Sequence, residues 1–447
     1  LLNFKFIDDL PHTKTYIPTE DGGKDLLNHP FSDQPIKIEE ALNILDKNVD
    51  TPGLNPASGG HLGYIPGGGV YPTALGDYLA AITNRYAGIY FGGPGAVRIE
   101  NMLIRWMCSI MGYPETASGN LASGGSIGNL IAIVTARDYK KIEPQIIQES
   151  VIYLTSQVHH CVQKAIRIAG LHRAQTTYIP VDENYKMDVN ALQEQIKSDI
   201  ADGKKPFLLI GSAGTTDVGA VDPLNDLADV AEEFNLWFHV DGAYGGFFML
   251  TGQGKAIMKG IERSDSLVID PHKGLFLSYG LGVVLIKNVQ AQKDAHQYQA
   301  NYMQDALNDT TELSPADLSP ELTKHFRGLR LWLPLQLFGL APFKSALDEK
   351  LMLTQYFYHQ IQKLGFEVGP FPELSVMIYR YVPTKGDAND FNKKLIHHVQ
   401  QDGRVFLSST TIDGKYWMRI AILAFRTHLT TINLCLEVLG EGVEKLK

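Results

Sequence analysis

The stretch Asp270-Pro271-His272-Lys273-Gly274 follows the apolar run 266–269 and decides how the fold is organised. Taken alone, a lysine after a strand would most simply belong to a solvated turn. A second segment changes this interpretation, because His239-Val240-Asp241-Gly242 follows the apolar residues 236–238 and places a carboxylate at another strand end. Open parallel sheets bind ligands beyond the carboxyl ends of their strands. An acid and a lysine at two such ends therefore predict a binding site.

Short apolar segments between residues 151 and 286 alternate with helical patterns. The predicted strands are 151–154, 177–179, 207–210, 236–240, 267–269 and 283–286. The predicted helices between the first four are 162–169, 189–200 and 223–234, and an amphipathic helix is expected over 96–110. This alternation indicates an α/β fold with a mainly parallel sheet that is covered on both faces.

The flanking regions differ in character from this central part. Residues 1–35 are predicted to form an irregular arm followed by a short helix over 38–45, and a long helical region is expected to follow 326–332 and to end near Leu364. Beyond it, the predicted strands are 375–381, 405–407 and 416–422, and the predicted helices are 388–401 and 430–446. We therefore expect an N-terminal arm (1–60), a large domain (61–334) and a small C-terminal α+β domain (335–447).

Composition excludes several classes of function. Hydrophobic residues make up 44% and charged residues 20% of the 447 residues, as in ordinary soluble proteins. The net charge of −9, with acids and bases interspersed, predicts no nucleic-acid partner, and no apolar run is long enough to span a membrane. Three cysteines without paired spacing indicate a reducing, cytoplasmic compartment. The chain starts without a signal-peptide pattern and without Met, so the loss of a targeting segment stays open.

A glycine-rich turn at Ser123-Gly124-Gly125-Ser126 opens a predicted helix that runs through 131–137. The free N–H groups at a helix start bind anions, and glycine lets a phosphate approach the backbone closely. A simple turn in which Ser126 caps the helix would leave the same pattern. The segment is not a Walker loop, because no Gly-Lys-Ser/Thr follows.

Two further segments follow predicted strands and gain meaning from the others. By itself, His159-His160-Cys161 could indicate a metal site or simply a packed histidine ring. If the other segments bind a planar aromatic ligand, His159 could instead stack against the face of that ligand. Thr215 follows the strand 207–210 and is equally typical of a turn. Together the segments predict a ligand with a phosphate, an aromatic ring, a ring nitrogen and an electrophilic carbon. A lysine that forms a Schiff base and an aspartate at the pyridine nitrogen are typical of pyridoxal 5′-phosphate (PLP) enzymes.

The same segments resemble the group II PLP-dependent amino acid decarboxylases, the family of aromatic-L-amino-acid, glutamate and diaminobutyrate decarboxylases. The resemblance covers Ser-Gly-Gly-Ser-Ile-Gly-Asn-Leu, the histidine segment, His-Val-Asp-Gly-Ala-Tyr-Gly-Gly and Asp-Pro-His-Lys-Gly, and extends from about Gly63 to Arg419. It implies fold type I, the aspartate-aminotransferase-like fold, and a homodimer with active sites at the interface. It also implies decarboxylation of an L-amino acid.

By position, the resemblance assigns roles to individual residues. Lys273 would form the Schiff base, Asp241 would pair with the pyridine nitrogen, and His159 would stack on the ring. The other cofactor residues would be Gly125, Ser126, Thr215, Ala243 and His272, and the substrate side would include Tyr64 and Pro66. Lys273, His159 and Asp241 are the predicted catalytic residues.

The sequence also departs from the family pattern. Ser58-Gly59 replaces the usual His-Pro, and Gly274 replaces the tryptophan that commonly follows the lysine. Aromatic amino acid decarboxylases carry a proton-donating tyrosine on a mobile loop, but the stretch 311–320 has none, and Pro315 stands near that position. Another PLP reaction, either aldehyde-lyase cleavage or transamination, is therefore the alternative, and a non-catalytic dimer is a third hypothesis. Arg419 is as typical of a structural salt bridge as of a carboxylate anchor.

Overall fold

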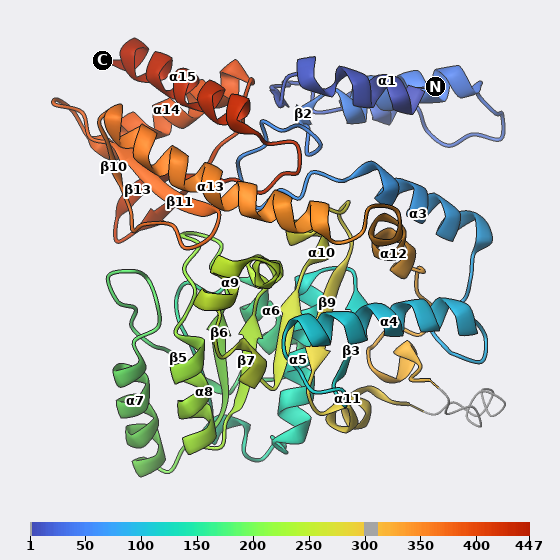
Figure 1. Ribbon diagram of the computed structural model, residues 1–447, viewed down its shortest axis with the longest axis vertical. Helices are drawn as coiled ribbons and strands as arrows, with labels where there is room; N and C mark the ends of the chain where they lie inside the picture. The colour runs from blue at the N-terminus through green and yellow to red at the C-terminus, as the bar shows by residue number, and fades with distance from the viewer. Residues whose placement is uncertain (1, 299–311) are drawn as a thin grey trace. The chain divides into compact units, whose positions relative to one another are not determined.

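The computed structural model describes residues 2–298 and 312–447, which form two compact units (Figure 1). One unit consists of residues 69–348 and 372–374, and the other contains the residues up to 68 together with 349–371 and 375–447. The expected division into three domains, at about residues 60 and 334, stays a prediction. By their contacts, the N-terminal and C-terminal parts of the chain belong to one unit.

The larger unit contains a seven-stranded sheet among the described residues, with the order β3-β9-β8-β7-β6-β4-β5. Its strands are β3 (Ser118–Ala122), β4 (Ser150–Leu154), β5 (Gln175–Tyr178), β6 (Lys205–Ser212), β7 (Trp237–Asp241), β8 (Ser266–Ile269) and β9 (Gly282–Ile286). Strands β5, β4, β6, β7 and β8 pair in parallel, whereas β9 runs antiparallel to both β8 and β3. The predicted α/β fold with a mainly parallel sheet is confirmed.

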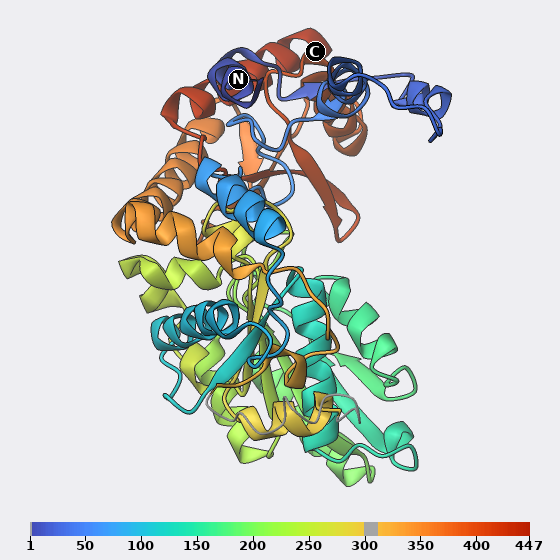
Figure 2. The same cartoon turned by 90° about the vertical axis from the view of Figure 1, so that its right-hand side faces the viewer.

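Helices cover both faces of this sheet, as Figure 2 shows. On one face, Ile152 and Leu154 of β4 pack with α5 (Gly125–Tyr139) and α6 (Cys161–Ile168) in a continuous apolar core. Successive side chains of a strand point to opposite faces. Tyr153 accordingly points to the other face, where its hydroxyl donates a hydrogen bond to Asp199 of α7 (Val189–Ala201) at 2.8 Å. Burial on both faces explains why strands such as β4 and β9 are mostly apolar.

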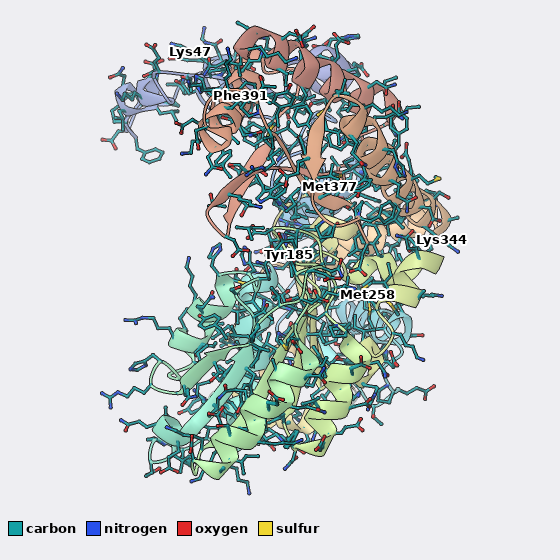
Figure 3. The ribbon with its side chains drawn as sticks, turned by 90° about the vertical axis from the view of Figure 1, so that its left-hand side faces the viewer. Lys47, Tyr185, Met258, Lys344, Met377 and Phe391 are labelled. Carbon is teal, nitrogen blue, oxygen red and sulfur yellow. The ribbon has the colours of Figure 1, made fainter. Side chains whose placement is uncertain are left out.

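The smaller unit contains an antiparallel sheet with the order β10-β11-β13-β12. Its elements are β10 (Phe366–Val368), β11 (Val376–Tyr381), β12 (Ser408–Ile412), β13 (Lys415–Ala421), α14 (Ala388–Asp402) and α15 (Leu429–Leu446). Met377 of β11 and Phe391 of α14, both labelled in Figure 3, belong to its core. Leu62 is buried in the same core, and its N–H donates to the Phe406 carbonyl. This contact explains why N-terminal residues join this unit.

Three details of the predicted elements differ from the structure. Strand β3 was missed because the residues 118–122 include serine, glycine and asparagine, although all five are buried. The predicted strand 405–407 precedes the actual strand β12. Its residues are buried in the core but form only one isolated β-bridge, at Phe406. The arm contains the helix α1 (Leu2–Asp9). The predicted long helical region after 326–332 is confirmed, and it consists of two helices, α12 (Gly328–Phe338) and α13 (Ala341–Lys363).

A buried ion pair attaches the segment 312–328 to the body of the larger unit. Lys324 Nζ lies 2.5 Å from Glu100 Oε2 of α4 (Pro94–Ile110), and both side chains are buried. Lys324 also donates to Asn120 Oδ1 of β3 at 3.3 Å, and Asn120 Nδ2 donates to the Pro315 carbonyl at 2.9 Å. These contacts connect the segment to a helix and to a strand. Across residues 2–298 and 312–447, no helix has the length and apolar content that crossing a membrane requires.

We expect Lys324→Met to lower the free energy of unfolding of the larger unit by about 3 to 5 kcal/mol, because it leaves the Glu100 carboxylate buried without its cation. Denaturant unfolding measures this loss. The double variant Glu100→Leu/Lys324→Met removes both charges and should recover most of it. A loss below about 1 kcal/mol for the single variant would show that the pair does not hold this segment.

Candidate active site

The larger unit contains a cavity of about 410 Å³ at the carboxyl ends of its parallel strands. All the residues predicted to bind the cofactor line it: Gly125, Ser126, His159, Thr215, Asp241, Ala243, His272 and Lys273. They come from segments that follow β3, β4, β6, β7 and β8, so the sheet topology brings them together. Tyr64 and Pro66 belong to the smaller unit, and their predicted place on the substrate side stays a prediction.

Lys273 lies in the short helix α10 (Pro271–Gly274) that follows β8, beside a carboxylate. Its Nζ is 3.1 Å from Asp270 Oδ2, and Asp270 is buried. Burial alone would lower the pKa of Lys273, but the charges of Asp270 and Asp241 and the hydrogen bond that Nζ donates to Asp270 outweigh it and raise the pKa. The amine therefore holds a proton in this state, and it needs to lose that proton before it can react with a carbonyl carbon.

The glycine turn at the start of α5 forms a tightly packed backbone cradle. A Cβ at Gly125 would lie 3.0 Å from Asp270 Oδ2 and 3.2 Å from the Cβ of Ala243. Glycine is therefore needed for the first turn of α5 to approach this wall of the cavity. The free N–H groups at the start of this 15-residue helix favour an anion. The cradle suits a phosphate group.

His272 and His159 each have one ring nitrogen with a defined partner. His272 Nδ1 lies against the Leu281 carbonyl, which only accepts, so the hydrogen of the ring is on Nδ1. His159 Nδ1 accepts the Cys161 N–H at 3.3 Å, so a neutral His159 ring carries its hydrogen on Nε2. Burial, followed by the neighbouring His160, lowers the pKa of His159 and favours this neutral ring. A neutral imidazole suits stacking on a planar ligand.

Asp241 lies at the end of β7 and is only 8% exposed. Its Oδ1 accepts the Ala243 N–H at 3.1 Å, and its Oδ2 accepts Asn129 Nδ2 at 3.2 Å. Hydrogen bonds to a carboxylate favour its charged form. The site thus presents an anionic acceptor opposite the phosphate cradle, as a protonated pyridine nitrogen requires.

Tyr279 and Asn129 are among the cavity-lining residues that the sequence did not predict. Tyr279 is 54% exposed, and its ring meets the His272 ring edge-on at 5.9 Å. Asn129 lies four residues after Gly125, and this helical spacing places the two on one side of α5 and could have revealed Asn129. The loop that carries Tyr279 has no comparable periodicity. Within 2–298 and 312–447, no group of three or more His, Cys, Asp or Glu side chains could hold a metal ion, so the metal interpretation of 159–161 lacks support.

Comparison with known proteins agrees with this geometry. The pyridoxal-dependent decarboxylase conserved domain matches residues 24–382. The chain belongs to this family. It is 34% identical over 450 residues to an aromatic-L-amino-acid decarboxylase of Bacillus atrophaeus, covering 98% of this chain and 93% of that protein. It is 26% identical over 437 residues to a phenylacetaldehyde synthase of Arabidopsis thaliana, covering 94% and 89%.

Solved structures show the same fold. Oryza sativa TDC with PLP and tryptamine superposes with a TM-score of 0.93 at 21% identity, over 100% of this chain and 96% of that chain. Mouse CSAD superposes with a TM-score of 0.90 at 23% identity, over 99% and 97%. The predicted fold type I is confirmed. The chain is a PLP-dependent amino acid decarboxylase, a lyase of amino acid metabolism.

We expect Gly125→Val in this decarboxylase to raise the dissociation constant for PLP at least about tenfold, because the added side chain overpacks the cradle against Asp270 and Ala243. Titration of the apo protein with PLP, followed by absorbance, measures the change. Gly252→Ala is the matched control, because a Cβ there meets nothing within 4 Å. Unchanged affinity in Gly125→Val would exclude this turn as the phosphate cradle.

Proposed function

We propose that Lys273 holds PLP covalently through Nζ and that Asp241 binds the pyridine nitrogen. The convergence of these two side chains in one cavity carries the proposal. His159 would lie against the ring, with Ala243 on its other face and Thr215 near it. Gly125, Ser126 and His272 would hold the phosphate. Bound PLP supplies an electron-withdrawing ring that takes up the electron pair left when the substrate loses its carboxylate.

The residues around the cavity have separate tasks in this proposal. Asp270 accepts a hydrogen bond from Lys273 Nζ and keeps this amine oriented. Asp241, which accepts two hydrogen bonds, keeps its negative charge beside the nitrogen. His159 is the candidate to return a proton to the substrate carbon, and its neutral ring would first have to take up a second proton. The described residues 312–320 contain no tyrosine for this step, and Thr311 lies outside the described residues.

We propose an aromatic L-amino acid as the substrate. The 34% identity to the aromatic-L-amino-acid decarboxylase of Bacillus atrophaeus, across nearly the whole of both chains, supports this class. A second outcome, in which an oxidant such as dioxygen takes up two electrons, ammonia is released and an aldehyde replaces the amine, is favoured by one observation. Pro315 stands near the tyrosine position, is buried, and has its carbonyl held by Asn120. A phenylacetaldehyde synthase is also among the relatives.

We expect the PLP-loaded protein to release carbon dioxide and the matching amine from an aromatic L-amino acid. A panel of L-amino acids with product analysis by mass spectrometry measures this. Lys273→Ala should release neither, and borohydride should no longer fix PLP to the protein, because the attacking amine is gone. Aldehyde or keto acid products from the wild type would favour the alternative reactions. If borohydride never fixes PLP to the wild type at saturation, the assignment of Lys273 is wrong.

We also propose that the enzyme is a homodimer, as the family resemblance implies. The helix α3 (Tyr71–Thr83) of the larger unit exposes Leu75, Tyr78, Leu79 and Ile82. Their spacing of three and four residues forms a continuous apolar stripe on one helix face. Such a stripe on a helix is typical of a surface that a partner covers.

We expect Leu79→Glu/Ile82→Glu to convert the dimer into a monomer, because two buried charges at the contact would have no partners. Light scattering coupled to size-exclusion chromatography measures the mass. Ile200→Glu is the control, because Ile200 is a similarly exposed apolar residue on α7. A dimer that persists in the double variant would place the interface elsewhere.

A cytoplasmic location is the remaining part of the proposal. The cysteines Cys108, Cys161 and Cys435 are all free thiols and buried. Disulfides are rare in reducing compartments, and unpaired buried cysteines are ordinary there. This supports the location without identifying it.

A further inference from the structure

A line of buried polar side chains runs through the larger unit and ends on Asp241. Trp237 Nε1 lies 2.8 Å from Ser266 Oγ, which lies 2.8 Å from His239 Nδ1. His239 Nε2 lies 2.7 Å from Asn129 Oδ1, and Asn129 Nδ2 lies 3.2 Å from Asp241 Oδ2. The first four residues are at most 1% exposed. The line therefore has no access to water except at the cavity.

The strand geometry explains how this line is assembled. Trp237, His239 and Asp241 are alternate residues of β7, so their side chains point to the same face of the sheet. Ser266 of β8 is the register partner of His239. Asn129, on α5, bridges His239 and Asp241 from above this face. Three elements of the fold thus contribute to one line.

The direction of every hydrogen bond in the line follows from chemistry. The Asp241 carboxylate only accepts, so the Asn129 NH₂ group faces it and the Asn129 oxygen faces His239. This oxygen accepts, so His239 carries its hydrogen on Nε2, and Nδ1 of the neutral ring accepts from the Ser266 hydroxyl. At the other end, the Trp237 indole N–H can only donate to Ser266. Every donor therefore points toward Asp241.

Such an alignment of hydrogen bonds stabilises the negative charge of Asp241. Hydrogen bonds that point the same way polarise one another, and the effect is large in a dry interior. The positive end of each dipole faces the carboxylate. The alignment needs a neutral His239, because an added hydrogen on Nδ1 would displace the Ser266 hydroxyl hydrogen. Burial lowers the pKa of His239 to about 4, which keeps the ring neutral at physiological pH.

We propose that Asn129, His239 and Ser266 are positioning residues that act through Asp241, holding its carboxylate charged and aimed at the cofactor nitrogen. This inference rests on the proposed role of Asp241. It predicts that cofactor affinity depends on side chains that never touch the cofactor. The effect should be strongest for Asn129, which contacts Asp241, and weaker for Ser266, which is three hydrogen bonds away from Asp241.

The test compares PLP with 1-deaza-pyridoxal 5′-phosphate, which has carbon in place of the ring nitrogen. Titration of the apo protein gives the dissociation constant of each ligand. The wild type should prefer PLP by about tenfold or more, as expected for a hydrogen bond between charged groups. Asn129→Leu should weaken PLP binding about tenfold and leave the binding of the deaza compound nearly unchanged, so that the preference disappears. Ser266→Ala should reduce the preference by about twofold to threefold.

Matched variants separate this role from stability. Tyr153→Phe removes another buried hydrogen bond, the one to Asp199, and should lower thermal stability without changing the preference for PLP. If Asn129→Leu does not fold, Ser266→Ala tests the inference by itself. An unchanged preference in a folded Asn129 or Ser266 variant overturns the inference and leaves the proposed function intact. A wild type with no preference for PLP overturns the proposed role of Asp241 itself.

Discussion

A buried charge is stable only when other groups of the protein compensate it, and this constraint accounts for most of the polar structure around the cavity. Strands β7 and β8 are buried along their whole length, so the polar side chains of His239 and Ser266 cannot reach water. Lys273 is paired with Asp270, and Lys324 with Glu100. Asp241 accepts a backbone N–H and a side-chain amide. Each charge is thus held in one place by its partner, which is the condition for binding a cofactor in one orientation.

The histidines around the site illustrate a related consequence of burial. His159 and His239 are neutral and carry their hydrogen on Nε2, whereas His272 carries its hydrogen on Nδ1. In each ring, the partner of one nitrogen determines what the other nitrogen can do. The same residue type therefore provides a ring for stacking, a link to Asp241 and a contact beside Lys273. Their sequence positions alone do not distinguish these roles.

The segment 312–328 is where this chain departs most from the pattern of aromatic amino acid decarboxylases. Pro315 is buried, and the contacts from Asn120 and Lys324 attach the segment to β3 and α4. Asn101 adds a hydrogen bond to the Leu313 carbonyl at 3.0 Å. The described part of this segment therefore packs as part of the body of the larger unit. Relatives that form amines and relatives that form aldehydes share the fold, so the reaction depends on the side chains around the substrate.

The amino-acid sequence was sufficient to predict the parallel sheet, the cofactor and eight of the residues that line the cavity. Those predictions rest on local signals: apolar runs that end in Asp241 or Lys273, and a glycine turn before a helix. Local signals fail where the burial of a segment depends on other elements that pack against it. The polar strand β3 was missed because its burial depends on β9 and α4. The apolar residues 405–407 were predicted as a strand, but they are buried without forming one, because a buried segment need not be extended.

Local sequence signals could not predict contacts between distant parts of the chain. Asn129 and His239 are 110 residues apart, and only the packing of α5 on β7 brings them together. Ser266 meets His239 because of the register between β7 and β8. The sequence therefore predicted Lys273 and Asp241 as the chemical groups of the site. The tertiary structure determined which side chains hold them, because a hydrogen bond depends on distance and direction in space.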